Sequence, residues 1–249
     1  MRADPETGGF EIWILDLPTG ILSRLTPHTC EDPQWSPDSR ELVYSSDQKG
    51  KLDLYRKEVG GGNEELVFES DEDKWAQQWL KDGSLLFENN SGPVNFYRLP
   101  LSGERKPVVL LETEVDKDNP RVSPNERWVA YQSQESGQWE VYIASFPSFG
   151  ERRQVSNGGG CQPRWRRDGK ELFYLGLEGK MRSVEVKGGP SLETNAPRIL
   201  FQTPLRVDAL AAAQYVAARD GERFLFGEPV GEVSKPVTIV LNWTAGVKR

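Results

Sequence analysis

The 249-residue sequence contains a single histidine, His28, and only two cysteines, Cys30 and Cys161. With one histidine, neither a histidine-bearing zinc motif nor a convincing Ser-His-Asp triad can be assembled. The cysteines belong to no Cys-x-x-Cys motif, and we expect two free, buried thiols. A Gly-x-Ser-x-Gly elbow and the kinase motifs are also missing. The sequence therefore predicts no catalytic residues, no metal and no cofactor.

Long apolar runs and an excess of positive charge are missing as well. No apolar run approaches the ~20 residues that a membrane helix needs, so we expect no membrane insertion by this segment. The amino-terminal stretch MRADPETGGF lacks the apolar core of a secretory signal. The net charge of −7 argues against a nucleic-acid binder, which would present a basic face to the phosphates. The one basic cluster, between Arg152 and Lys170, is expected to be a solvated hairpin surface.

What the sequence does contain is a cassette that returns about every 43 residues. Its turn residues Asp38, Asp82, Asn125 and Asp168 are separated by 44, 43 and 43 positions. The copies are DPQWSPDSRELVYSS (32–46), AQQWLKDGSLLFENN (76–90), NPRVSPNERWVAYQS (119–133), QPRWRRDGKELFYLG (162–176) and the weaker QYVAARDGERFLFGE (214–228). The last copy arrives late because residues 187–208 carry an insertion. A fixed period of this size indicates a repeat architecture.

Each repeat predicts four strands, which are clearest in the first copy. Residues 33–36 form a short strand, and Ser36-Pro37-Asp38-Ser39 is a turn because proline sets φ at the second position. Residues 41–45 and 52–56 form the second and third strands, the third with alternating apolar and polar residues. Residues 65–68 form the fourth. Four antiparallel strands in a repeat of this length are typical of a β-propeller blade.

The sequence therefore predicts an all-β protein, a β-propeller of four-stranded blades. Residues 10–25 look like the third and fourth strands of a blade, which gives about five blades plus a leading half blade, as part of a six-bladed or larger ring. The predicted organisation is a tail (1–9), the propeller (10–243) and a second tail (244–249). Trp35, Trp79 and Trp165 recur at one register of the first strand, where burial between blades is expected.

The cassette PxWSPD(G/S)xxLxF, followed by a strand of the LDLY or WEVY type, resembles the TolB-type, WD-repeat-like family of bacterial propellers. The closing segment VTIVLNWTAGVKR (237–249) also resembles the carboxyl end of bacterial proteins in which a serine/threonine kinase precedes such a propeller. The resemblance implies a sensor or interaction module, periplasmic if it follows a membrane-anchored kinase and otherwise cytoplasmic. Two copies depart from the motif, since Leu80-Lys81 and Arg166-Arg167 replace Ser-Pro.

Candidate binding residues lie in the first strands. In a propeller the first strand is innermost, so alternating positions there could face the central channel. Polar groups from several blades would suit a small polar ligand, or a protein or peptide partner, at the funnel face. The candidates are Asp32, Gln34, Gln78, Asn119, Arg121, Gln162, Arg164 and Gln214.

Two enzyme-related alternatives stay open at this point. The first is a calcium-dependent propeller lactonase that uses carboxamides and carboxylates of the channel, Asp32 and Asn119 among them. Separately, the acidic loops that enter the first strands could bind Ca²⁺ or a basic peptide. The second is the gating propeller of a prolyl-oligopeptidase-like peptidase whose hydrolase domain lies elsewhere. The leading hypothesis is a non-catalytic module that binds a partner or ligand.

Overall fold

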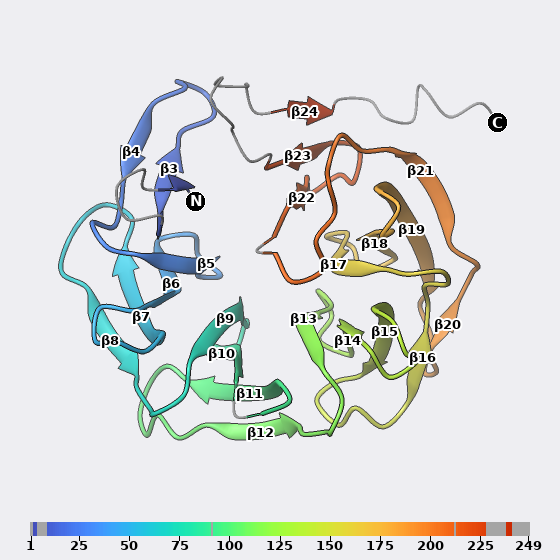
Figure 1. Cartoon of the computed structure of the whole chain (residues 1–249), viewed down its shortest axis with the longest axis horizontal. Helices are drawn as coiled ribbons and strands as arrows, with labels where there is room; N and C mark the ends of the chain where they lie inside the picture. Colours follow the sequence, from blue (N-terminus) through green and yellow to red (C-terminus); the bar gives the residue numbers. More distant parts are fainter. Residues whose placement is uncertain (1, 4–8, 91, 212, 228–237, 241–249) are drawn as a thin grey trace. The chain divides into compact units, whose positions relative to one another are not determined.

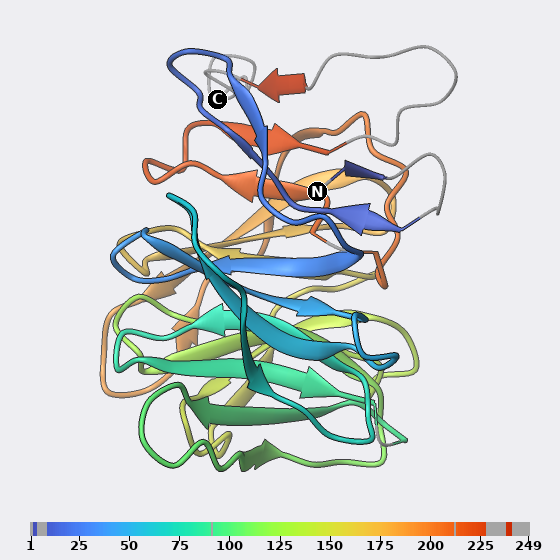
Figure 2. The ribbon, with the colours of Figure 1, turned by 90° about the vertical axis from the view of Figure 1, so that its left-hand side faces the viewer.

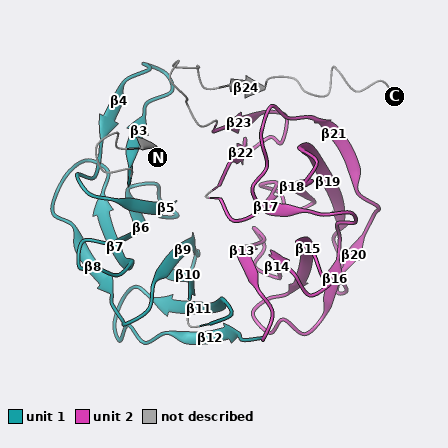
Figure 3. Ribbon diagram, in the orientation of Figure 1, with its two compact units in different colours: residues 1–113 teal, residues 114–249 magenta. Residues whose placement is uncertain are grey.

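The computed structural model describes residues 2–3, 9–90, 92–211, 213–227 and 238–240. Every regular element assigned within these ranges is a β-strand (Figure 1). None of the described residues forms a helix long and apolar enough to cross a membrane. The chain divides into two compact units, residues 1–113 and 114–249 (Figure 3), which are described separately.

Unit 1 contains two four-stranded sheets, two strands of the leading half blade, and a short pair formed by β1 (Arg2–Ala3) and β2 (Phe10–Glu11). The half blade consists of β3 (Trp13–Leu15) and β4 (Leu22–Arg24). The two full sheets are β5 (Cys30–Trp35), β6 (Glu41–Ser46), β7 (Asp53–Glu58) and β8 (Glu65–Phe68), then β9 (Lys74–Trp79), β10 (Ser84–Asn89), β11 (Asn95–Pro100) and β12 (Val108–Leu111). Neighbouring strands run antiparallel, as the side view in Figure 2 shows.

Unit 2 contains one four-stranded sheet, one five-stranded sheet and one sheet of which three strands are described. Its strands are β13 (Lys117–Val122), β14 (Trp128–Ser133), β15 (Glu140–Ser145) and β16 (Arg152–Gln154), then β17 (Cys161–Trp165), β18 (Glu171–Leu175), β19 (Lys180–Lys187), β20 (Glu193–Thr194) and β21 (Arg198–Gln202), then β22 (Tyr215–Ala217), β23 (Phe224–Phe226) and β24 (Thr238–Val240). The predicted insertion supplies β20, which pairs with the end of β19. The all-β, four-stranded plan is thus confirmed, whereas the total number of blades stays a prediction.

The hydrophobic cores lie between successive sheets, because each sheet is apolar on both faces. In unit 1, Val43 and Leu54 of one sheet pack with Leu85 and Phe87 of the next. In unit 2, Ala130 and Ile143 pack with Leu172 of the following sheet. Stacked rings recur on neighbouring second and third strands, as in the Tyr44–Tyr55 pair with ring centroids 6.4 Å apart. Many small inter-sheet cores therefore take the place of one large core.

The first strands of successive sheets lie side by side, β5 against β9 and β13 against β17. Each of β5, β13 and β17 contains a bulge, and the residue before its proline has a left-handed backbone. The φ angles are +49° at Asp32, +56° at Asn119 and +53° at Gln162. Short polar side chains, asparagine and aspartate above all, tolerate this conformation better than β-branched ones.

The predicted burial of the tryptophan register is wrong for Trp35, which is 47% exposed. Trp79 and Trp165 are half-buried and pack against inter-sheet cores. The Trp165 indole donates a hydrogen bond of 2.8 Å to the carbonyl of Arg121 on the first strand of the preceding sheet. Trp35 follows the half blade, whose described strands β3 and β4 are third and fourth strands. The described residues before β5 therefore supply no equivalent first strand for Trp35 to pack on.

Candidate binding site

In unit 1, the candidate residues tie the first strands together. Asp32 and Gln34 lie on β5, and Gln78 lies on β9. The Gln34 side-chain amide donates to the carbonyl of Asp32 at 3.1 Å and to the carbonyl of Ala76 on β9 at 3.3 Å. All three candidates are half-buried. Gln34 therefore contributes to the contact between two sheets as well as to the polarity of the surface.

In unit 2, the structure brings four candidates together on two adjacent strands. Asn119 and Arg121 lie on β13, and Gln162 and Arg164 occupy the corresponding positions of β17. Asn119 and Gln162 are buried, whereas both arginines are half-buried. Within the bulge, the amide of Asn119 donates to Asp118 Oδ2 at 3.1 Å. The two positions thus differ in role, because the residue before the proline points into the protein and the arginine after it keeps contact with solvent.

Gln162 is the centre of a hydrogen-bond network. Its Oε1 accepts the backbone N–H of Gln214 at 2.8 Å, and its Nε2 donates to the carbonyl of Asp208 at 3.1 Å. Its backbone carbonyl accepts the Tyr215 hydroxyl at 3.0 Å. The side chain is fully buried. Gln162 therefore fixes the segment before β22 against β17, and Gln214 is joined to the same network.

Gln132 on β14 belongs to this network and was missed by sequence reasoning. Its Oε1 accepts the backbone N–H of Gln162 at 2.8 Å, and its Nε2 donates to the carbonyl of Ala209 at 2.6 Å. In unit 1, Ser45 plays the same part, because its hydroxyl accepts the backbone N–H of Ala76 at 3.0 Å. Gln132 and Ser45 occupy the same position of the repeat, and this alignment is the sequence feature from which the role of Gln132 could have been predicted.

Arg121 and Arg164 form the charged part of the site. Each guanidinium donates to the carbonyl of its preceding proline, at 2.9 Å to Pro120 and 2.8 Å to Pro163. These contacts hold both side chains along their strands. Burial raises the pKa of the Tyr215 hydroxyl, and the positive charges of Arg164 and Arg121 oppose that rise. The two arginines therefore act on the same buried ring and lie in one electrostatic neighbourhood.

The cysteines are free and buried, as predicted. Burial raises the pKa of the Cys161 thiol to about 12, helped by the negative charges of Asp118 and Asp208. Burial likewise raises the pKa of Cys30. Both thiols are therefore protonated at neutral pH, the unreactive form.

The acidic loops that enter the first strands use several carboxylates internally. Asp73 accepts the backbone N–H of Leu52 at 2.9 Å, and Asp208 accepts that of Leu210 at 2.9 Å. Asp118 accepts the side-chain amide of Gln132 at 3.3 Å. Among the described residues there is no group of three or more histidine, cysteine or acidic side chains that could hold a metal ion.

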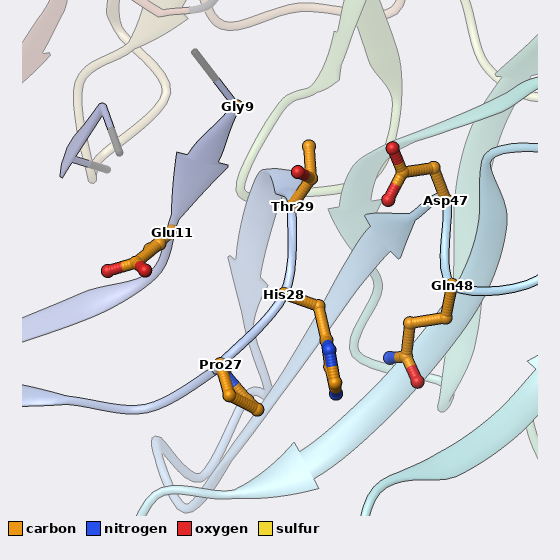
Figure 4. A pocket seen from close by; sticks show the side chains of 7 residues that line it. All are labelled: Gly9, Glu11, Pro27, His28, Thr29, Asp47 and Gln48. Carbon is orange, nitrogen blue, oxygen red and sulfur yellow. The ribbon is translucent and has the colours of Figure 1, made fainter. Parts of the chain in front are cut away.

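A separate pocket of about 240 Å³ lies in unit 1 beside the only histidine (Figure 4). Its lining residues His28 and Thr29 lie between Glu11 on one side and Asp47 and Gln48 on the other. The Glu11 carboxylate accepts a hydrogen bond of 2.9 Å from the Trp13 indole and pairs with an arginine. Among the candidate binding residues, none lines this pocket.

The family model of the TolB β-propeller domain matches residues 3–157. The chain belongs to this family. The match covers the half blade, both full sheets of unit 1 and the first sheet of unit 2, and it confirms the resemblance inferred from the cassette.

Solved structures support the TolB-type fold at low sequence identity. TolB from Acinetobacter baumannii is 18% identical with a TM-score of 0.69, over 88% of this chain and 54% of that one. An oligogalacturonate lyase in complex with manganese is 17% identical with a TM-score of 0.64, over 97% of this chain and 70% of that one. A prolyl endopeptidase structure is 12% identical with a TM-score of 0.53, over 86% of this chain and 34% of that one. The chain spans about half of the Acinetobacter TolB, and no curated protein matches it.

Proposed function

We propose that this TolB-type propeller segment is a non-catalytic binding module that recognises a protein or peptide partner, or a small polar ligand, through its first strands. The observation that carries the proposal is the pair Arg121 and Arg164, placed at corresponding positions of the adjacent strands β13 and β17. Both side chains are half-buried and oriented by the proline carbonyls. Such guanidinium groups suit bidentate contacts with a carboxylate.

The nature of the ligand follows from the mixed charge around this pair. Asp118, Asp208 and Arg164 all act on one thiol, because the two carboxylates raise the pKa of Cys161 and the guanidinium lowers it. A simple anion would meet these carboxylates as well as the arginines. A zwitterionic or peptide-like ligand, with donors beside its carboxylate, fits the surroundings better. The upstream kinase inferred from residues 237–249 would make the module its sensor, and only Thr238–Val240 of that segment lie within the described residues.

The test is NMR chemical-shift mapping with a pool of short peptides that end in a free carboxylate, compared with the same pool after amidation. We expect shifts at Arg121 and Arg164 with the free-carboxylate pool only, and their loss in the Arg121→Ala/Arg164→Ala variant. Arg153→Ala on the outer strand β16 is the matched control. Contacts confined to the outer strands, with both arginines unaffected, would refute the proposal.

The non-catalytic part of the proposal has its own test. Without a nucleophile paired with a base, the purified chain is expected to show no ester or lactone turnover, with or without Ca²⁺. Calcium-dependent hydrolysis that disappears in Asp32→Ala would favour the lactonase alternative.

A further inference from the structure

The turn between the first and second strands has the same geometry in every repeat. The carbonyl of the first turn residue accepts the N–H of the fourth, as in Arg166 to Gly169 and Ala218 to Gly221, both at 2.9 Å. The side-chain oxygen of the third residue, a carboxylate in four repeats and the Asn125 amide in the other, accepts the N–H of the fifth. The second position is exposed in four repeats and half-buried at Pro124, and it is occupied by Pro37, Lys81, Pro124, Arg167 and Arg219. The last two repeats thus present an arginine from the same place on a rigid turn.

These two Arg-Asp-Gly turns line one pocket of about 500 Å³ in unit 2. Its lining residues are Arg166, Arg167, Asp168, Arg219 and Asp220. A Cβ at Gly221 would lie 2.8 Å from Cδ of Arg166, so the arginine stem packs directly on the second turn. The φ of +75° at Gly221 adds to the reason for glycine there. The two turns therefore form one continuous surface.

The two carboxylates of the pocket already have cationic partners. Asp168 accepts two hydrogen bonds of 2.9 Å from Arg166, which lower the pKa of its carboxyl. Asp220 lies 3.3 Å from the guanidinium of Arg223. Arg167 and Arg219 are exposed, and neither pairs with an acidic group within the described part of the chain. The guanidinium groups of Arg167 and Arg219 are therefore the charges of this pocket that can contact a ligand.

We propose that this pocket binds a phosphate monoester, with one guanidinium from each turn contacting the phosphate oxygens. A phosphate monoester carries nearly two negative charges at neutral pH, so it complements two cations, whereas a single carboxylate complements one. The planar fork of arginine matches phosphate geometry. The site lies at the turns after the first strands. It is therefore independent of the Arg121 and Arg164 pair.

The experiment is an NMR titration that monitors the backbone amides of Gly169 and Gly221, one in each turn. The probes are inorganic phosphate, a peptide with one phosphoserine, and the same peptide with glutamate in its place. We expect saturable shifts of both glycines with the phosphate probes and much weaker binding of the glutamate peptide. Tighter binding of the phosphopeptide than of inorganic phosphate would indicate a phosphorylated protein as the source, and equal binding a small phosphate ester.

Arginine variants separate this site from general charge attraction. Arg167→Ala/Arg219→Ala should weaken phosphate binding at least about tenfold, because two charge-assisted hydrogen-bonding groups are lost. Arg40→Ala/Arg153→Ala removes the same charge from exposed positions and should change the affinity less than about twofold, given screening by salt. Preserved shifts elsewhere in the spectrum show that the variants fold. The absence of saturable shifts, binding unchanged in the first variant, or equal binding of the glutamate peptide would overturn the proposal.

Discussion

Replacing Gln162 tests whether the segment before β22 is held by one side chain. Gln162→Ala removes the acceptor of the Gln214 N–H and the donor to the carbonyl of Asp208. A hydrogen bond contributes about 1 kcal/mol net, and a buried donor left without a partner costs about 1–3 kcal/mol. Because the side chain is fully buried, we expect a loss of about 2–4 kcal/mol in the free energy of unfolding.

The nature of the substitution refines the prediction. Gln162→Glu keeps an acceptor for Gln214 but, when ionised, turns a carboxylate oxygen toward the carbonyls of Asp208 and Ala211. Burial disfavours the charged form, so its pKa should lie above the ordinary glutamate value. A protonated carboxyl can donate again. The Glu variant should therefore be least stable near neutral pH and recover part of the loss, relative to the parent protein, as the pH falls toward 5.

Urea denaturation gives the free energy, and hydrogen exchange at the Gln214 amide locates the effect. The control is Gln154→Ala on β16, an exposed glutamine with hydrogen bonds to Tyr142 and Ser156, where a change within about 0.5 kcal/mol is expected. If Gln162→Ala and Gln154→Ala lost the same free energy, and Gln214 exchange stayed slow in both, the network would carry none of the stability assigned to it.

Three further changes have defined outcomes. Trp79→Ala should lower the free energy of unfolding by about 2–4 kcal/mol and Trp35→Ala by less than about 1 kcal/mol, since Trp79 packs on an inter-sheet core and Trp35 is largely exposed. Equal losses in urea titrations would contradict this. Burial raises the pKa of Tyr174 to about 12, so its stabilising contribution is complete below pH ~10 and is lost as the pH rises toward 12. Tyr174→Phe introduces the residue found at the same place of another repeat, Phe87, and should reduce alkaline unfolding. Identical curves of stability against pH for the two proteins would argue against this. Hydrogen bonds from Arg105 and Arg56 lower the pKa of Glu65, so its contribution to stability is present above the ordinary glutamate pKa of ~4.3 and is lost as the pH falls below it. Glu65→Gln should therefore reduce the loss of stability at acid pH, which thermal melts between pH 3 and 6 would check.

The repeat could be predicted from the sequence because it is encoded locally. The turn Ser36-Pro37-Asp38-Ser39 closes with the expected hydrogen bond, 2.9 Å from Ser39 N to the Ser36 carbonyl. The predicted strand 52–56 corresponds to β7, which begins one residue later, at Asp53, and continues to Glu58. Trp35 shows the limit of this reasoning, because its burial depends on a first strand in the preceding sheet. A recurring residue has a recurring environment only where its neighbour recurs as well.

The partners of Gln162 could not be predicted for a different physical reason. Its amide donates to the carbonyls of Asp208, the last residue of the insertion 187–208, and of Ala211 just after it, and this insertion has no counterpart in the other repeats. Every residue has a backbone carbonyl, so the sequence does not show which carbonyl will accept a hydrogen bond. The conformation of an insertion also depends on the surface on which it packs. Gln132 could have been suspected from its alignment with Ser45, but its hydrogen bond to the carbonyl of Ala209, the residue that follows the insertion, could not.

The polar residues of the first strands occupy two positions, one before the proline and one after it. Only the position after the proline is free of a backbone constraint, so it is the better candidate for ligand binding. The residue before the proline has a left-handed backbone at Asp32, Asn119 and Gln162, which favours short or amide side chains whatever the ligand. Where proline is replaced by Gln77, the preceding Ala76 has no positive φ and is apolar. The position after the proline has an ordinary strand backbone, so no local conformation requires an arginine there. If Arg121 and Arg164 recognise a ligand, as proposed, substitutions at this position of β13 and β17 should change binding before they change the free energy of unfolding.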